Sequence, residues 1–367
     1  MSETQAFAET PVAEPTRIDL TREWVRRRLF DGPWNSLLTI LAIAFLVWAV
    51  PPALNWFFFD AVWSGGDPAA CRGAEGACWA MVHDKYRLIL FGRYPYMEQW
   101  RPLLGMLVLI AAVAVSCRRA NWKLWLAGVW IAAFAVFFGL MWGGFLGMTH
   151  VRSELWGGLP LTLLLAMVGI AVAFPLSIVL ALGRRSKMPV IRAICVVYIE
   201  FIRGVPLISL LFMASFMLPL FLPEGISIAA LLRAQIAIIL FSAAYLAEVI
   251  RGGLQALPNG QVEAAQAIGL SYWQTQRMIV LPQAIRMVIP PIVNTFIGLF
   301  KDTSLVAIVS LTDLLLAMRQ AVADPEWRVY FVEGYVFIAM IYFVFCFFMS
   351  KYSQYLERDL YTGNRRS

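Results

Sequence analysis

The chain has 367 residues, of which 60% are hydrophobic and 14% are charged, and its formal net charge is +7. Soluble globular proteins are about 25% charged and about 45–50% apolar, so this composition excludes that class and indicates a membrane protein. The positive charge does not indicate a nucleic-acid ligand, because the basic residues lie at the ends of apolar runs, as the positive-inside rule describes.

Residues 1–34 form a polar segment that contains the basic run Arg26–Arg28. The segment has no apolar stretch followed by a small-residue cleavage site, which argues against a cleaved signal peptide. We expect a disordered cytoplasmic tail that ends in a helix at the membrane interface.

Eight apolar runs follow, and each predicts a membrane-spanning helix, since a span needs about 20 residues. The runs cover residues 35–58, 102–116, 124–142, 159–182, 195–222, 229–250, 290–311 and 329–350. The second run is short, and Tyr94, Tyr96 and Trp100 extend it at an interface. We therefore predict an all-α polytopic membrane protein with about eight transmembrane helices.

The runs divide the chain into parts. After the tail, residues 35–154 hold three helices and an outer loop, residues 59–101. Residues 155–350 hold the last five helices, and residues 351–367 form a second tail. The outer loop contains Cys71 and Cys78, with six residues between them, and an oxidising compartment favours a disulfide between them over free thiols.

The distribution of Lys and Arg predicts the orientation in the membrane. If the N-terminus is inside, the inner segments hold 19 of the 30 basic residues, the outer segments hold nine, and Arg203 and Lys301 lie within spans. Both termini are then cytoplasmic, and so is the polar segment 251–289.

Segment 251–289 is too polar to span a bilayer and predicts two short helices. Asn259 is expected to cap a helix over residues 260–268, and Gly269 to end it in the left-handed conformation. Ser271 and Gln274 have the spacing of a capping box that starts the second helix.

The same segment carries a recognisable motif. From Glu263 to Pro282 it reads E-A-A, three residues, G, nine residues, I-x-L-P. This string resembles the EAA motif of ABC-importer permeases. Residues 245–253 and 294–305 resemble the polar amino-acid branch of that family, closest to the general L-amino-acid permeases, over about residues 155–355. An amphipathic loop of no special role is the alternative.

The resemblance implies that residues 155–350 are the permease core of a type I importer in a bacterial inner membrane, which moves L-amino acids by alternating access. The implied partners are an ATPase dimer, a sister permease in a heterodimer, a periplasmic amino-acid-binding protein and membrane lipid. ATP and Mg would be bound by the ATPase, so no cofactor is expected here. The residues expected to couple to the ATPase are Glu263, Ala264, Ala265, Ala267, Gly269, Leu281 and Pro282.

Polar residues within the spans are candidates for the substrate pathway or a gate, because charges there are costly unless they are paired or functional. These candidates are Arg203, Glu248, Asn294, Lys301, Asp302, Thr303 and Ser304. Arg203 and Glu248 are expected to pair, as a packing salt bridge or as a gate. Lys301 and Asp302 either form an ion pair with each other or bind the two charged ends of a zwitterionic substrate.

Neither a metal site nor a catalytic constellation is indicated. The two histidines, His83 and His150, lack ligand spacing, and no Lys is followed by Ser or Thr as in a Walker A motif. The chain is therefore expected to be a transport subunit and not an enzyme. The alternative is an ion-driven secondary transporter or channel that works without an ATPase.

Overall fold

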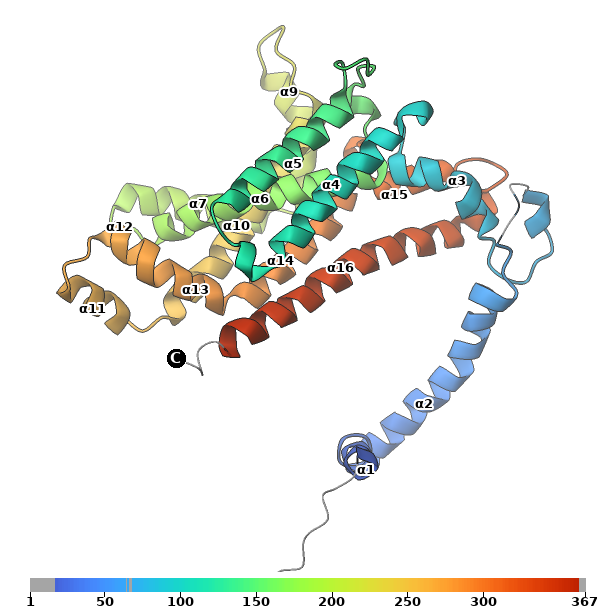
Figure 1. Cartoon of the computed structure of the whole chain (residues 1–367), viewed down its shortest axis with the longest axis horizontal. Coiled ribbons are helices and arrows are strands. Elements are labelled where there is room, and N and C mark those ends of the chain that lie inside the picture. The colour runs from blue at the N-terminus through green and yellow to red at the C-terminus, as the bar shows by residue number, and fades with distance from the viewer. Residues whose placement is uncertain (1–16, 64, 66–67, 363–367) are drawn as a thin grey trace, which may run out of the picture. The chain divides into compact units, whose positions relative to one another are not determined.

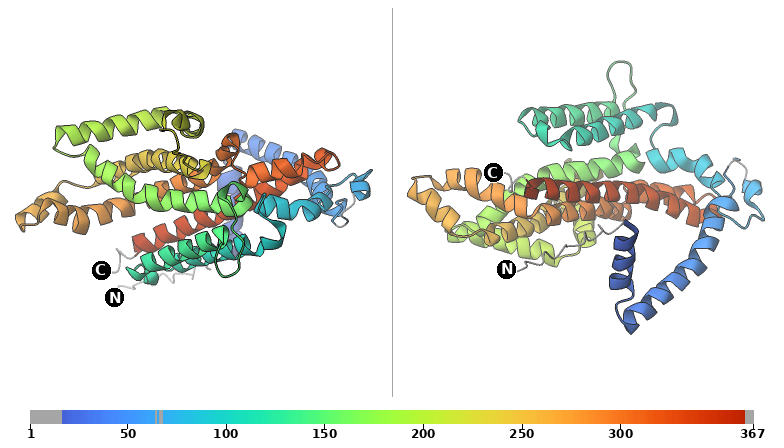
Figure 2. Two further views of the ribbon diagram at one scale, coloured as in Figure 1. Left: turned by 90° about the horizontal axis from the view of Figure 1, so that it is seen from above. Right: turned by 60° about the horizontal axis from the view of Figure 1, so that its bottom comes forward.

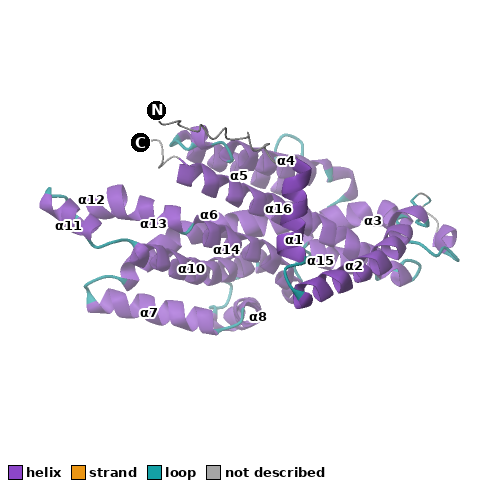
Figure 3. Ribbon diagram, turned by 90° about the horizontal axis from the view of Figure 1, so that it is seen from below, coloured by secondary structure: helices purple, strands orange, loops and turns teal. Residues whose placement is uncertain are grey.

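A computed structural model describes residues 17–63, 65 and 68–362. This part of the chain consists of helices and loops (Figure 3). It divides into two compact units, Met1–Trp79 and Ala80–Ser367. Residues 1–16 and 363–367, which belong to the two expected tails, lie outside the described residues.

The first unit is built on one long apolar helix. Helix α1 (Arg17–Leu29) carries the basic run in its last turn. Helix α2 (Pro33–Leu54) starts at a proline and continues into a π-helical turn, Asn55–Phe59. In the loop that follows, the Trp79 ring lies 4.8 Å from that of Phe57, centroid to centroid. The sulfur atoms of Cys71 and Cys78 are bonded, and their Cα atoms are 5.8 Å apart.

The second unit is a helical bundle. Helices α6 and α10, each of 27 residues, pack along each other, and α14 packs on α16. Helices α4 and α5 form an antiparallel pair at the outside of this bundle (Figures 1 and 2). The helices are α3 (Ala80–Phe91), α4 (Trp100–Ser116), α5 (Trp125–Trp142), α6 (Gly158–Arg184), α7 (Pro189–Gly204), α8 (Leu207–Phe212), α9 (Leu218–Phe221), α10 (Ala230–Ala256), α11 (Gly260–Ala267), α12 (Tyr272–Thr275), α13 (Leu281–Met287), α14 (Ile289–Asp302), α15 (Leu314–Ala321) and α16 (Phe331–Thr362).

The prediction of an all-α protein with about eight spans is confirmed. Among the described residues, seven helical segments are long and apolar enough to cross a membrane, and a bent pair of helices makes up to eight. The short second run becomes long enough because a 3₁₀ turn extends it back to Tyr96.

The span expected over residues 195–222 is not one continuous helix. Helix α7 ends at Gly204, and the next helical segment, Leu207–Phe221, is bent away from it by 103°. Figure 3 shows α8 lying crosswise at the end of α7. Val205 is extended, with φ −106° and ψ 133°, because it precedes Pro206, and a residue before proline avoids the helical region.

Helix α15 begins at a fully buried carboxylate, Asp313. Its side chain accepts hydrogen bonds from the backbone N–H groups of Leu315 and Leu316, at 3.1 and 3.0 Å. The Leu314 N–H donates to Thr162 Oγ1 of α6, at 3.1 Å. Burial raises the pKa of Asp313 to about 6, although the two backbone hydrogen bonds favour the ionised form.

Candidate functional site

The polar segment after α10 folds as an elbow of two short helical pieces, α11 and α12–α13, at one end of the second unit (Figure 1). The expected turn at Gly269 is present. Gly269 has φ +81°, its N–H donates to the Gln266 carbonyl at 2.9 Å, and the Leu270 N–H donates to the Ala265 carbonyl at 3.1 Å. These bonds form a Schellman motif, which satisfies the carbonyls at the end of α11.

The capping box is also present. Gln274 N–H donates to Ser271 Oγ at 3.4 Å, and Ser271 N–H donates to Gln274 Oε1 at 2.8 Å. After α12 a π-helical turn, Gln276–Val280, leads into α13, where Pro282 lies in the first turn and needs no hydrogen-bond partner for its nitrogen.

The prediction that Asn259 caps α11 with its side chain is wrong. Asn259 has helical dihedral angles, φ −59° and ψ −28°, and makes no side-chain cap. The turn already starts at Pro258, whose carbonyl accepts from the Gln261 N–H at 3.2 Å. A capping side chain requires an extended backbone, which Asn259 does not have.

The inner face of the elbow packs on the bundle. Val280 and Ala284 are buried in one cluster with Ala247, Ile250 and Leu254 of α10. A Cβ atom placed on Gly253 would lie 2.6 Å from the Ala284 carbonyl oxygen, so α10 and α13 are close enough to require glycine there. Gln283 Nε2 donates to Gln261 Oε1 at 3.2 Å, which joins α13 to α11. The elbow is therefore a braced body on the end of α10.

The outer face of the elbow is not covered by any of the residues that the structure describes. Glu263, Ala264 and Ala267 are exposed, whereas Ala265 is only 1% exposed. Ala265, one of the residues expected to couple to the ATPase, is therefore on the face of α11 that packs inward and not on its exposed surface. Leu281 is half-buried, and Pro282 is exposed.

Sequence reasoning missed three large apolar side chains that are exposed on the elbow. Ile268, Trp273 and Met278 are 74%, 70% and 66% exposed. Apolar groups in an otherwise polar segment were the available signal, because an exposed apolar patch marks an interaction surface.

Glu248, near the end of α10, is the centre of a charge cluster. It accepts two hydrogen bonds from Arg251, one of them from Nε at 2.8 Å, and one from Arg184 Nη1 at 3.2 Å. Arg203 Nη1 lies 3.9 Å from Glu248 Oε2, and Arg184 also pairs with Glu200 at 2.7 Å. The structure thus brings Arg203 and Glu248 together as expected, but Arg251 and Arg184 hold the carboxylate more closely.

Arg203 lies at the bend between α7 and α8. Its guanidinium carbon is 5.7 Å from the centre of the Tyr245 ring, and its Nε is buried without a hydrogen bond among the described residues. A weakly held arginine at a broken helix can change partners more easily than Arg251, which is fixed by two bonds to its neighbour one turn away.

The candidates on α14 and in the 3₁₀ helix that follows it, Thr303–Val309, separate into two groups. Thr303, one of the pathway candidates, is fully buried, and its hydroxyl donates to the Phe300 carbonyl at 2.7 Å. Ser304 Oγ donates to the Lys301 carbonyl at 2.8 Å. No Lys301–Asp302 ion pair occurs in the described part of the chain, so these two charges do not simply satisfy each other.

One face of α14 is open. Asn294 and Lys301 are exposed, and a Cβ atom on Gly298 would meet no atom within 4 Å. The spacing of these three positions, four and three residues, places them along one side of the helix. No group of three or more His, Cys, Asp or Glu residues among those described could hold a metal ion.

Known proteins resemble this chain both over its core and over its whole length. Residues 173–361 match the family described as "Binding-protein-dependent transport system inner membrane component". The chain is 52% identical over 347 residues to the inner membrane amino-acid ABC transporter permease protein YhdY of Escherichia coli (strain K12), and the alignment covers 93% of each protein.

Two further relatives bear on the site. The glutamate/glutamine/aspartate/asparagine transport system permease protein BztC of Rhodobacter capsulatus is 38% identical over 437 aligned residues, covering 100% of each protein. A solved structure described as a crystal structure of an amino acid ABC transporter with histidines is 32% identical. It aligns with a TM-score of 0.50 over 55% of this chain and 92% of its own.

Proposed function

The chain belongs to the binding-protein-dependent transport system inner membrane component family and is a permease subunit of an amino-acid ABC importer, and we propose that it carries L-amino acids by alternating access. It is a multi-pass protein of the inner membrane, it is not an enzyme and it binds no cofactor, because ATP is handled by a partner ATPase. Membership of this family argues against the alternative function, an ion-driven secondary transporter or channel.

The elbow is the proposed contact with the ATPase, and its geometry carries the proposal. Its inner face is fixed to α10, whereas its outer face exposes a carboxylate at Glu263, small residues at Ala264 and Ala267, and apolar side chains at Ile268 and Trp273. A body braced in this way would transmit an ATPase movement to α10 instead of absorbing it. Gly269 provides the left-handed turn between α11 and α12. Leu281 and Pro282 start α13, which packs on α10.

The open face of α14, with Asn294 and Lys301, is the proposed wall of the substrate pathway. The described part of the chain leaves this face uncovered, and a sister permease in a heterodimer would supply a second wall. Lys301 and Asp302 could meet the carboxylate and ammonium groups that all L-amino acids share. Arg203 and Glu248 are the proposed inner gate.

We also propose the orientation and its domains. The tail over residues 1–34, the elbow in segment 251–289 and residues 351–367 face the cytoplasm. Loop 59–101 faces the periplasm, where an amino-acid-binding protein delivers substrate. The basic run at the end of α1 and the arginines at the elbow end of the bundle support this orientation by the positive-inside rule.

The test is uptake of labelled L-amino acids into proteoliposomes that contain the whole complex. Uptake should require ATP inside the ATPase-facing compartment and the binding protein on the other side, and unlabelled L-amino acids should compete for it. The four amino acids in the name of the similar BztC protein are the first competitors to try. Uptake that an ion gradient drives without ATP would disprove the proposal.

Glu248→Gln tests the gate. The neutral amide cannot balance three guanidiniums, so we expect transport per complex to fall at least about tenfold, a barrier change of about 1.4 kcal/mol, while assembly is kept. Glu200→Gln is the matched control, because Glu200 also pairs with Arg184 but is more exposed, 53% against 23% for Glu248. If Glu248→Gln lowers only the amount of protein in the membrane, the cluster is structural.

A further inference from the structure

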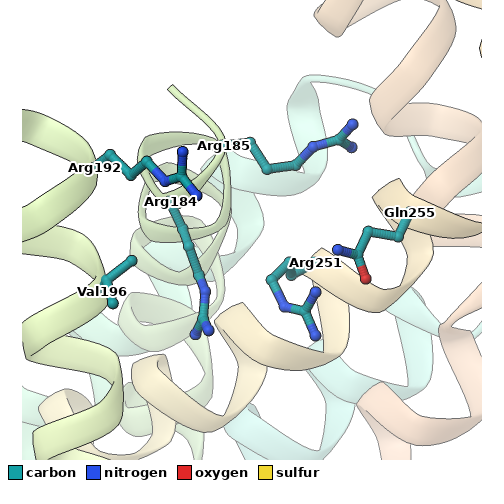
Figure 4. A pocket seen from close by; sticks show the side chains of 6 residues that line it. All are labelled: Arg184, Arg185, Arg192, Val196, Arg251 and Gln255. Carbon is teal, nitrogen blue, oxygen red and sulfur yellow. The ribbon is translucent and has the colours of Figure 1, made fainter. Parts of the chain in front are cut away.

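A basic cavity lies beside the Glu248 cluster. It has a volume of about 510 Å³ and is lined by Arg184, Arg185, Arg192, Val196, Arg251 and Gln255. Figure 4 shows Arg184 and Arg192 on one side of this space and Arg251 and Gln255 on the other. Water occupies about 30 Å³ per molecule, so the cavity has room for roughly 15 waters or for a hydrated anionic group.

The guanidiniums around this cavity are not balanced by carboxylates. Arg184 and Arg251 share Glu248, and Arg184 also pairs with Glu200. Arg185 donates to a neutral acceptor, the Leu254 carbonyl, at 2.7 Å. Arg192 forms no ion pair with any described residue. Arg185 and Arg192 therefore hold two positive charges that face the cavity without a carboxylate partner among the described residues.

The position of the cavity indicates which anion it meets. Its residues come from the last turn of α6, the connection to α7, the first two turns of α7 and the last two turns of α10. Helix α6 has 27 residues and so spans about 40 Å, whereas the hydrocarbon layer is about 30 Å thick. An untilted helix of this length extends past the hydrocarbon layer, and its Arg184 end carries the positive charge that matches the depth of the lipid phosphates.

The helix that supplies Arg192 and Val196 also carries an uncovered apolar stripe. Val190, Ile194, Val197 and Phe201 of α7 are all exposed and recur at helical spacing. An acyl chain beside α7 would cover apolar surface while its headgroup reached the arginines at the helix start. Basic pockets at the cytoplasmic ends of membrane helices are suited to anionic headgroups.

We propose that this cavity is a binding site for a phosphate-bearing anion, the headgroup of an anionic membrane phospholipid. Arg185 and Arg192 bind the phosphate oxygens, because a guanidinium presents paired N–H donors that match them. Gln255 adds a neutral donor. The Glu248 cluster keeps Arg184 and Arg251 in place and leaves the two unpaired arginines as the specific contacts.

The test uses the whole transport complex, with its ATPase and sister permease, in nanodiscs. One set is made of phosphatidylcholine and the other of phosphatidylcholine mixed with phosphatidylglycerol. Native mass spectrometry then counts the phosphatidylglycerol molecules that each complex retains. We expect Arg185→Gln with Arg192→Gln to weaken retention at least about tenfold relative to the unmodified complex.

The matched control is Arg118→Gln with Lys123→Gln. These residues are exposed in the loop between α4 and α5, on the inner side in the proposed orientation, and the change removes the same charge away from the cavity. The control should retain phosphatidylglycerol like the unmodified complex. Equal loss in both double variants would show a general charge effect and would overturn the proposal.

A second arm distinguishes a lipid from a soluble anion. Millimolar inorganic phosphate is added to the complex in phosphatidylcholine nanodiscs, and thermal unfolding is measured. Phosphate could stabilise the unmodified complex but not the Arg185/Arg192 variant, while phosphatidylglycerol is not preferentially retained. This result would keep the phosphate site but assign it to a soluble anion. If neither probe distinguishes the variant from the control, or if the variant loses only its ATPase, the site does not bind phosphate.

Discussion

At the scale of single residues, Gly269 sets the geometry of the elbow. Its φ of +81° is accessible to glycine, whereas other residues pay about 1–2 kcal/mol there and β-branched ones more. A Cβ atom at this position would meet nothing within 4 Å, so any effect of a substitution comes from the backbone or from a docked partner.

Gly269→Val should therefore abolish most substrate-stimulated ATP hydrolysis by the complex. The variant strains the turn and shifts α12 relative to α11. Gly260→Val is the control. Gly260 starts α11, the helix that ends just before Gly269, and it also has open space around it but no positive φ. Full coupling in Gly269→Val would show that the elbow does not transmit the ATPase movement.

Asp313 provides a prediction on pH. Its pKa is about 6 in the fold, against about 3.9 for an unperturbed Asp, so the folded state prefers the neutral form. Ionisation then costs the fold about 3 kcal/mol, a cost that is complete above pH 6 and disappears as the pH falls toward 4. Asp313→Asn keeps an oxygen for the helix cap and cannot ionise.

The measurement is the unfolding temperature of the detergent-solubilised chain at several pH values. The unmodified protein should gain stability as the pH is lowered from about 7 to about 5, and Asp313→Asn should gain less over the same interval. Parallel curves for the two proteins would mean that Asp313 titrates normally.

The docking face of the elbow can be tested at one carboxylate. Glu263→Ala should reduce the amount of ATPase that co-purifies with the permease by up to about tenfold, since a partly solvated interfacial charge contact contributes little more than about 1–2 kcal/mol. Glu224→Ala, an exposed carboxylate in the loop between α9 and α10, is the control and should have no effect. Equal ATPase recovery from both variants would place the contact elsewhere.

At the scale of elements, the contact between α10 and α13 connects the elbow to the bundle. Gly253→Ala would place a methyl group 2.6 Å from the Ala284 carbonyl oxygen, so the two helices must separate. We expect this variant to lower the unfolding temperature and to weaken coupling.

The neighbouring glycine is its control. Gly252→Ala meets no atom within 4 Å, and alanine in a helix is favoured over glycine by up to about 1 kcal/mol, so this variant should be as stable as the unmodified protein or more stable. If both alanine variants behave alike, close packing at Gly253 is not what holds the elbow.

Elements that depend only on residues close together in the chain could be predicted from the sequence. The turn at Gly269 and the Ser271–Gln274 capping box depend on residues within one turn of each other, and both are present. The bend before Pro206 had the same kind of local signal. The burial of Ala265 was not predictable, because it depends on which side of a short, weakly amphipathic helix meets the bundle.

Contacts between residues far apart in the chain could not be predicted either, because they too depend on how the helices pack. The spacing of Glu248 and Arg251, three residues on one helix, already indicates a pair. The contact of Glu248 with Arg184 joins residues far apart in the chain, and only the packing of α6 on α10 brings it about. Composition and apolar run length were sufficient for the number of spans, since membrane thickness fixes that length.

At the scale of the whole molecule, the proposed orientation places Cys71 and Cys78 in an oxidising compartment. Mass spectrometry after alkylation without reductant should recover both residues unmodified by the reagent. Cys117, which is partly exposed and free, is the internal control and should be alkylated. Alkylation of Cys71 and Cys78 to the same extent as Cys117 would contradict the bridge.

Helix α16 is longer than a membrane is thick. Its 32 residues extend about 48 Å, against about 30 Å of hydrocarbon, so about three turns must emerge or the helix must lean steeply. At its far end Asp359 pairs with Arg119, in the connection between α4 and α5, at 2.9 Å. The tip of α16 therefore lies against the connection between α4 and α5, and any tilt of α16 would displace this tip farther than the middle of the helix.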